Sequence, residues 1–142
     1  MRAILLILIG LSSLSFAEFS KQNGVVSDST TNLEWQDDYS DNGGDIKNTT
    51  WKDSIDYCES LSLDGGGWRL PNVRELESIV DDTKTNPSIN SVFELISSNI
   101  YWSASTYAND SDTAWVVMFY YGRVNPYKKT YSYDVRCIRT GE

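Results

Sequence analysis

Two stretches in the first half of the chain carry hydrophobic residues at helical spacing. The first apolar stripe consists of Trp51, Ile55, Cys58 and Leu61. This stripe predicts a helix that begins near Thr50 and turns Cys58 toward the core. We expect the Thr50 hydroxyl to cap the amide of Asp53, because a threonine at a helix start accepts a hydrogen bond from the first turn.

The second stripe follows three consecutive glycines at positions 65–67. Its apolar residues are Val73, Leu76 and Val80. Asn72 precedes the stripe and Glu75 lies three residues later, which is the spacing of a capping box at the start of a helix. After it, residues 81–90 predict a turn region around Pro87. A short helical or irregular packing segment is expected to contain Ile89, Val92, Phe93 and Ile96.

One strand is expected before the helices. Residues 28–36 predict a turn followed by a short strand, because Asp, Ser and Asn favour turns and Leu33 and Trp35 alternate with polar residues. The polar, glycine-containing residues 37–49 predict a loop that leads into the first helix.

The remaining strands are expected after position 100. Aromatic and β-branched residues predict strands at 101–105 and 114–122, with a hairpin turn near Gly122. Residues 134–139 predict a last strand in which Val135 and Cys137 alternate with Arg136 and Ile138. Cys137 is then expected to point inward. Helices first and strands later favour an α+β fold over a parallel βαβ array.

The first 17 residues have the features of a secretory signal peptide. Arg2 precedes an apolar run over residues 3–11, and Ser15 and Ala17 are the small residues of an A-x-A-like cleavage site. The alternative is an uncleaved membrane anchor, which would need roughly 20 apolar residues. Serines interrupt the run before it reaches that length. We expect residues 18–142 to form one exported domain that does not insert into a membrane.

The composition restricts the partners and the chemistry. The chain has 12 lysines and arginines against 20 aspartates and glutamates, a formal charge of −8 that becomes −9 when Arg2 is removed with the signal peptide. Repulsion from phosphates makes nucleic acid an unfavourable partner. The chain contains no histidine, which excludes Ser-His-Asp and Cys-His catalysis and imidazole zinc sites.

Cys58 and Cys137 are the two cysteines of the chain. In an exported protein an even pair is expected to form a disulfide, and two free or reactive thiols are the alternative. Closing a loop of about 79 residues stabilises a fold by roughly 4 to 5 kcal/mol in the chain-entropy account. The bond would join the first helix to the last strand.

Five short motifs occur in an order that resembles one family. They are DSTTNLEWQ at 28–36, WKDSIDYC at 51–58, WRLPNVREL at 68–76, YWSAS at 101–105 with AWVVMFYYG at 114–122, and VRCIR at 135–139. Together they resemble the Lcl C-terminal domain, named for a bacterial collagen-like adhesin. The resemblance implies a compact single domain with a C-type lectin-like or formylglycine-generating-enzyme-like fold. Such a fold packs two helices on a twisted antiparallel sheet, and its recurrent cysteine pair matches Cys58 and Cys137.

Departures from the family pattern limit what the resemblance implies. Asn32 stands where members usually have glycine, and asparagine is the residue that best replaces glycine in a left-handed turn. No Gly-X-Y repeat is present, so no collagen stalk accompanies the domain. The net charge argues against sulphated glycans as ligands. Formylglycine generation would need a second late cysteine beside Cys137.

Aromatic residues concentrate between positions 101 and 133. The five tryptophans are expected to pack in the core as a group: Trp35, Trp51, Trp68, Trp102 and Trp115. Four late tyrosines lie among polar residues instead, namely Tyr107, Tyr127, Tyr131 and Tyr133. Exposed rings beside hydrogen-bonding groups suit sugar rings or a protein partner, and packing within the loops is the alternative.

Polar residues near these tyrosines complete the predicted ligand surface. Asn109 and Asp112 belong with Asp110 to the loop 108–113, where they could grip hydroxyls or ligate calcium; solvated turn residues are the alternative. The late basic residues are Arg123, Lys128 and Lys129. They could contact a carboxylate or sulphate, or they could protect the edge of a β-hairpin.

The loop before the first helix is acidic. Asp37, Asp41 and Asp45 offer the oxygen ligands that calcium prefers. Their spacing does not follow the EF-hand pattern, and no glutamate closes the loop at position twelve. We therefore expect a solvated acidic loop, with calcium as the weaker alternative and no other cofactor indicated.

These features predict a non-catalytic binding module. The main hypothesis is a secreted, periplasmic or surface-exposed bacterial module that adheres to a glycan or a protein through the late tyrosines. The alternative is a structural or assembly domain of the cell envelope, acting as a homo-oligomer or with another protein. A hydrolase would have to rely on carboxylates, tyrosines and serines that no motif marks.

Overall fold

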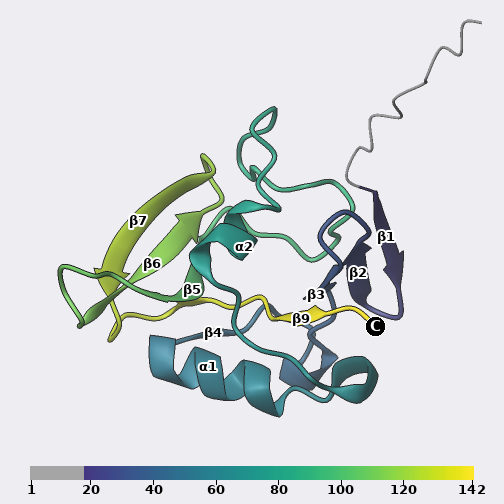
Figure 1. Ribbon diagram of the computed structural model, residues 1–142, viewed down its shortest axis with the longest axis horizontal. Helices are drawn as coiled ribbons and strands as arrows, with labels where there is room; N and C mark the ends of the chain where they lie inside the picture. The colour runs from purple at the N-terminus through teal and green to yellow at the C-terminus, as the bar shows by residue number, and fades with distance from the viewer. Residues whose placement is uncertain (1–17) are drawn as a thin grey trace, which may run out of the picture.

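The computed structural model describes residues 18–142, and the expected signal peptide at 1–17 lies outside them. Two antiparallel-dominated sheets and two α-helices make up the fold, which confirms the α+β class. In Figure 1 the strands β5, β6 and β7 lie on the left, the β1–β2 hairpin lies on the right, and α1 runs along the bottom. None of the described helices is long and apolar enough to cross a membrane.

The first sheet has the strand order β1-β2-β3-β9 and is antiparallel throughout. Its strands are β1 (Phe19–Gln22), β2 (Val25–Asp28), β3 (Leu33–Gln36) and β9 (Ile138–Thr140). The predicted strand at Leu33 is confirmed. Asn32 has a φ of 56°, so the left-handed turn expected at this position is present. The hairpin of β1 and β2 was not predicted.

The second sheet has the order β4-β8-β5-β6-β7, with β7 at its outer edge. Its strands are β4 (Asn48–Thr49), β5 (Ile100–Thr106), β6 (Thr113–Met118), β7 (Arg123–Lys128) and β8 (Tyr133–Asp134). Only β5 and β8 pair in parallel. The prediction of strand over 114–122 is too long, because the Gly122 amide bonds to the Met118 carbonyl at 2.8 Å and closes a turn. The turn at Gly122 is confirmed.

The first helix, α1, spans Trp51–Ser60 as the apolar stripe predicts. Cys58 is buried, whereas Trp51 and Ile55 are half-buried against the same core. The predicted cap is wrong, because Thr50 stands at the N-cap but its side chain makes no capping hydrogen bond. Leu61, the last member of the stripe, is buried just beyond the helix.

The second helix, α2, is short and spans Val73–Glu77. The predicted capping box is present: the Glu75 amide donates to Asn72 Oδ1 at 2.8 Å, and the Asn72 amide donates to Glu75 Oε1 at 2.9 Å. Val80 is not part of the helix, because the chain leaves helical geometry after Glu77 and pairs Val80 with Ile89 in an isolated bridge. Ile79 is buried there instead.

Two hydrophobic clusters form the core. The cluster beside α1 contains Cys58, Trp68, Trp102, Val116 and Cys137, among others. The cluster beside α2 contains Trp35, Leu76, Phe93, Tyr101 and Val117, among others. Successive residues of β6 therefore face different clusters, so this strand is covered on both sides. The segment after Ile89 packs irregularly, with Phe93 buried and Ile96 exposed.

A disulfide joins Cys58 of α1 to Cys137, with a Cα–Cα distance of 5.4 Å. It connects the two cysteines that the sequence pairs. The segment around Cys137 differs from the predicted strand: only Tyr133–Asp134 and Ile138–Thr140 are strands. Between them the backbone bonds to two separate segments: the Val135 amide donates to the Lys47 carbonyl at 2.8 Å, and the Cys137 carbonyl accepts from the Gln36 amide at 2.9 Å.

Arg136 does not follow the predicted alternation with Val135 and Cys137. It is as buried as they are, with only 1 % of its surface exposed. Its guanidinium donates to Asp37 Oδ1 at 3.1 Å and lies 4.7 Å from the centre of the Phe93 ring. A buried charge requires a paired carboxylate, and Asp37 supplies it from the other end of the chain. Arg136 and Asp37 therefore link the last segment to the loop after β3.

Candidate functional site

Three of the four late tyrosines form a ring cluster at one end of the second sheet. Tyr133 lies between the other two: its ring centre is 5.5 Å from that of Tyr127 and 6.3 Å from that of Tyr131. The inner side of Tyr133 packs edge-on against buried Trp102 at 4.9 Å. Tyr131 is 53 % exposed. We call Tyr127, Tyr131 and Tyr133, together with Trp51 and Lys129, the late aromatic surface.

The position of these rings follows from the pairing of short strands. Thr49 of β4 pairs with Tyr133 of β8, which places the beginning of α1 beside the end of β7. The Trp51 amide donates to the Lys129 carbonyl at 3.2 Å. The Lys129 ammonium lies 3.9 Å from the centre of the Trp51 ring and donates to Thr106 Oγ1 at 2.9 Å. A cation over an indole is attracted by the ring quadrupole, so these two contacts hold the Lys129 ammonium against Trp51.

The hydroxyls of Tyr127, Tyr131 and Tyr133 make no hydrogen bond to any other residue in 18–142. Partial burial and the neighbouring Tyr127 and Tyr131 hydroxyls raise the pKa of Tyr133 above its ordinary value of 10.0. Its hydroxyl is therefore protonated at physiological pH and is able to donate as well as accept. The surface combines apolar ring faces with hydroxyl groups that have no protein partner among residues 18–142.

Tyr107, the fourth predicted tyrosine, is not part of this cluster. Its ring packs edge-on against Trp115, with the ring centres 5.0 Å apart. Trp115 lies on the side of β6 that faces α2, whereas Tyr127 packs against the cluster beside α1. Neighbouring strand positions point to opposite faces, and this separates Tyr107 from the other three tyrosines.

The loop 108–113 is stabilised by its own side chains. The Asp112 amide donates to Asp110 Oδ1 at 3.0 Å, and Asn109 Nδ2 donates to the Tyr107 hydroxyl at 3.0 Å. The backbone amide of Asp112 and the ammonium of Lys128 lower the pKa of Asp110. Asn109 and Asp112 are exposed, and the Lys129 amide donates to the Asp112 carbonyl at 2.9 Å.

The late basic residues do not form one group. Lys128 lies at the end of β7 and pairs with Asp110 at 3.2 Å, beside Lys129. Arg123 lies at the other end of the same strand, 5.8 Å from the Tyr121 ring centre. A strand of this length separates its ends by roughly 16 Å. Arg123 therefore belongs to the hairpin tip with Tyr120 and Tyr121 and not to the late aromatic surface.

The three aspartates considered for calcium point in different directions. Asp37 is buried, and its carboxylate is bound by Lys21 at 2.7 Å and Arg136 at 3.1 Å. Asp41 accepts a hydrogen bond from the Tyr57 hydroxyl at 3.3 Å, and Asp45 lines a separate hollow with Asp134. Across residues 18–142 no group of three acidic or cysteine side chains is arranged to hold a metal ion. Asp41 and Asp45 are exposed as expected for a solvated loop, whereas Asp37 is buried, because its carboxylate is the counter-charge of Lys21 and Arg136.

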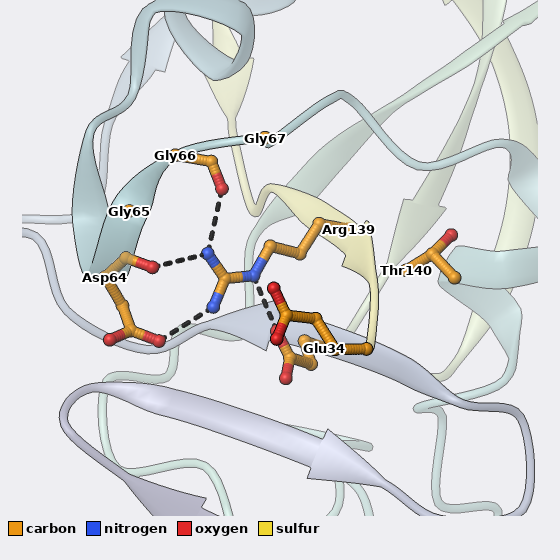
Figure 2. A pocket seen from close by; sticks show the side chains of 8 residues that line it. Glu34, Asp64, Gly65, Gly66, Gly67, Arg139 and Thr140 are labelled. Carbon is orange, nitrogen blue, oxygen red and sulfur yellow. Dashed lines mark hydrogen bonds and ion pairs between the residues drawn. The ribbon is translucent and has the colours of Figure 1, made fainter.

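A hollow of about 550 Å³ lies between β3, β9 and the glycine loop at 65–67 (Figure 2). The guanidinium of Arg139 lines this hollow, and each of the three guanidinium nitrogens donates to a protein acceptor. Nη1 reaches the carbonyls of Asp64 and Gly66 at 2.8 Å, Nη2 reaches the Asp64 carboxylate at 2.7 Å, and Nε bonds to Glu34. Since the guanidinium is already satisfied and stacks on Trp68 at 4.4 Å, this hollow anchors the loop rather than binding an anion.

The sequence profile of the Lcl C-terminal domain matches residues 24–139 of the chain. The chain belongs to the Lcl C-terminal domain family. A comparison with curated proteins finds none that matches it.

The five motifs of this Lcl C-terminal domain build its framework. They supply β3, both helices, the disulfide, Arg136, most of β5, and β6 with the turn at Gly122. Within the late aromatic surface only Trp51 comes from a motif, whereas residues 127–133 lie outside all five. The family motifs therefore account for the framework of the fold, whereas the late aromatic surface is built mainly from residues outside them.

Sequence reasoning missed the place of Trp51 in this surface. Trp51 is half-buried, and so is Trp115, whereas Trp35, Trp68 and Trp102 are buried as expected. The apolar stripe gave one signal for this position, because Trp51 is both the first member of the stripe and the first residue of α1. The contact of Trp51 with Lys129 depends on the pairing of β4 with β8. These strands have only two residues each, which is too short for the sequence to predict their pairing.

Proposed function

We propose that this Lcl C-terminal domain is an exported, non-catalytic bacterial binding module that recognises a glycan or a protein through its late aromatic surface. The observation that carries the proposal is the cluster of three tyrosine hydroxyls without a protein partner, held on packed rings beside Lys129. Aromatic side chains give a ligand a large apolar contact at small entropy cost, and their polar ends provide directed hydrogen bonds.

Export is supported by two independent features. Residues 1–17 have a secretory pattern, and the cysteines at 58 and 137 are joined in a disulfide. Disulfides persist in oxidising compartments such as the periplasm and the cell surface and are rare in the cytosol. We propose the same location for this domain, and its negative charge disfavours nucleic acid as a partner.

The experiment compares two tyrosines of similar exposure. The purified mature domain is screened on arrays of glycans and host-matrix proteins, together with Tyr131→Ala and Tyr121→Ala variants. Tyr131 is 53 % exposed and Tyr121 is 58 % exposed, but they lie at opposite ends of the late hairpin. We expect Tyr131→Ala to weaken binding at least tenfold and Tyr121→Ala to leave it unchanged. Binding that survives Tyr131→Ala and Tyr127→Ala would show that the ligand lies elsewhere.

A second candidate function is favoured by the tip of the same hairpin. Tyr120 and Tyr121 are both exposed and pack against each other with ring centres 4.4 Å apart, with Arg123 beside them. Tyrosine and arginine are frequent in the energetic centres of protein interfaces. An envelope assembly domain would use this tip to contact another protein or a second copy. In that case Tyr121→Ala, and not Tyr131→Ala, would abolish self-association in light scattering or capture from envelope extract.

A further inference from the structure

A separate groove runs between α2 and the outer strands of the second sheet. It has a volume of about 390 Å³ and is lined by Val73, Arg74 and Glu77 of α2, Trp115 of β6 and Val124 of β7. Pockets that bind small molecules in proteins typically have about 300 to 1,000 Å³ and combine apolar walls with a few polar groups. We call this feature the α2 groove.

Three polar groups around the α2 groove have no hydrogen-bond partner within residues 18–142: the Arg74 guanidinium, the Glu77 carboxylate and the Trp115 indole N–H. Several groups of the same kinds have protein partners, although the buried Trp35 indole N–H also has none. Arg69 pairs with Glu75 at 2.7 Å, and the indoles of Trp51, Trp68 and Trp102 donate to backbone carbonyls. The α2 groove therefore offers two donors and one acceptor to a ligand.

The floor of the α2 groove is an ordered aromatic ring. Trp115 is half-buried, and Tyr107 packs edge-on against it at 5.0 Å between ring centres. Pro126 pairs with Trp115 across β6 and β7 and supports it from the next strand. A supported indole face loses little conformational entropy on binding, and it suits the apolar face of a sugar ring.

The charges around the α2 groove indicate which ligands fit. Arg74 and Glu77 carry opposite charges and lie three residues apart, on one side of α2. Asp82 lines an adjoining hollow of about 230 Å³ that also includes Glu77. A sulphate or carboxylate brought to Arg74 would meet Glu77 and Asp82, so anionic ligands are disfavoured. Hydroxyl groups match both the donors and the acceptor.

We propose that the α2 groove is a second binding site, which takes a neutral oligosaccharide with one sugar ring on Trp115 and its hydroxyls on Arg74 and Glu77. The adjoining hollow shares Glu77 and extends the site toward Gly122, so the ligand spans more than one sugar unit. This site lies on the α2 side of the sheet, whereas the late aromatic surface lies on the α1 side. The proposal does not depend on the function of the late aromatic surface.

The test follows the indole signals of the five tryptophans by two-dimensional NMR. The Trp115 signal is assigned with a Trp115→Phe variant, and the mature domain is titrated with neutral tetrasaccharides of glucose, mannose, galactose and N-acetylglucosamine. We expect at least one tetrasaccharide to shift the Trp115 signal and to leave the Trp51 signal in place. A sulphated tetrasaccharide of matched length should bind at least tenfold more weakly.

Variants then identify the polar contacts. Glu77→Gln and Arg74→Ala should each weaken binding of that tetrasaccharide at least fivefold without changing the melting temperature, because neither side chain has a protein partner in the described residues. Glu59→Gln, an exposed change on α1, is the matched control and should have no effect. The proposal is overturned if no neutral tetrasaccharide shifts Trp115, or if Glu77→Gln and Arg74→Ala bind like the wild type. Tyr131→Ala should leave this binding intact even where it abolishes array binding.

Discussion

Residues 127–133 of the late aromatic surface and the closing segment at 134–139 are adjacent in sequence and opposite in environment. Each contains a cation that lies over an aromatic ring. Lys129 lies 3.9 Å from the centre of Trp51 at the surface and bonds to a threonine hydroxyl. Arg136 lies 4.7 Å from the centre of Phe93 in the interior and is paired with the buried carboxylate of Asp37.

This difference teaches that neighbouring aromatic and basic residues do not by themselves indicate a binding surface. Inside the protein a cation needs a full counter-charge, because desolvation is costly. At the surface water screens the charge, and a hydroxyl partner is sufficient. The closing segment therefore holds the fold together, while residues 127–133 leave polar groups available. The following predictions test this division between stability and binding.

Removing the disulfide should have the largest effect. The double variant Cys58→Ala with Cys137→Ala should lose roughly 4 to 5 kcal/mol of unfolding free energy, because the bond closes a loop of about 79 residues in the unfolded chain. Urea denaturation of the variant and the oxidised wild type measures the loss. A loss below about 1 kcal/mol would mean that the closing segment is held by its other contacts alone.

Neutralising Asp37 should cost about 3 kcal/mol, because Asp37→Asn leaves the charge of Arg136 buried without a counter-charge. The same change removes the bond to Lys21, whose pKa is raised: burial opposes this rise, and the hydrogen bonds to Asp37 and Glu94 outweigh it. Urea denaturation provides the measurement, and Asp41→Asn in the exposed loop is the control. If both variants unfold at the same urea concentration, the buried pair of Asp37 and Arg136 contributes no more to the unfolding free energy than an exposed aspartate does.

Glu75 should make stability depend on pH in the acid range. Its hydrogen bond from Arg69 lowers its pKa below 4.5, against the effect of burial and with help from the Asn72 amide. A lowered folded-state pKa means that this stabilisation is present above pH 4.5 and is lost as the pH falls further. Glu75→Gln should therefore cost about 1 kcal/mol at pH 7 and less at pH 3. Thermal melts at both pH values test this, with Glu59→Gln as the control.

Tyr131→Ala should change stability least, by less than about 0.5 kcal/mol, because the side chain is largely exposed and makes no hydrogen bond in the described residues. The melting temperature should stay within a few degrees of the wild type. A loss above about 2 kcal/mol would show that the late aromatic surface is part of the core, and the division between the two regions would then fail.

Local features of the fold were predictable. The apolar stripe located α1, the Asn72 and Glu75 pair located the start of α2, and Gly122 located the turn between β6 and β7. Gly122 has a φ of 71°, and an added Cβ would lie 2.6 Å from Val80. Each signal depends on residues within a few positions of one another. The two-residue strands β4 and β8 gave no such signal, because only their partners define them.

The candidate site was predictable in its residue types and only partly in its membership. Tyr127, Tyr131 and Tyr133 do lie together, but Tyr107 and Arg123 lie elsewhere. Alternation places Arg136 on the opposite face from Val135 and Cys137, whereas the irregular backbone at 135–137 buries all three. Alternation predicts direction only where the chain is a regular strand.

The sequence by itself determined the α+β class, the family, the disulfide partners and the two helix starts, because these follow from composition, motif order and contacts between near neighbours. Only the tertiary structure decided that Arg136 is buried against Asp37, that Lys129 meets Trp51, and that Trp115 forms the floor of the α2 groove. These contacts join residues about 40 to 100 positions apart, and their free energy depends on which distant segments lie together in the folded chain.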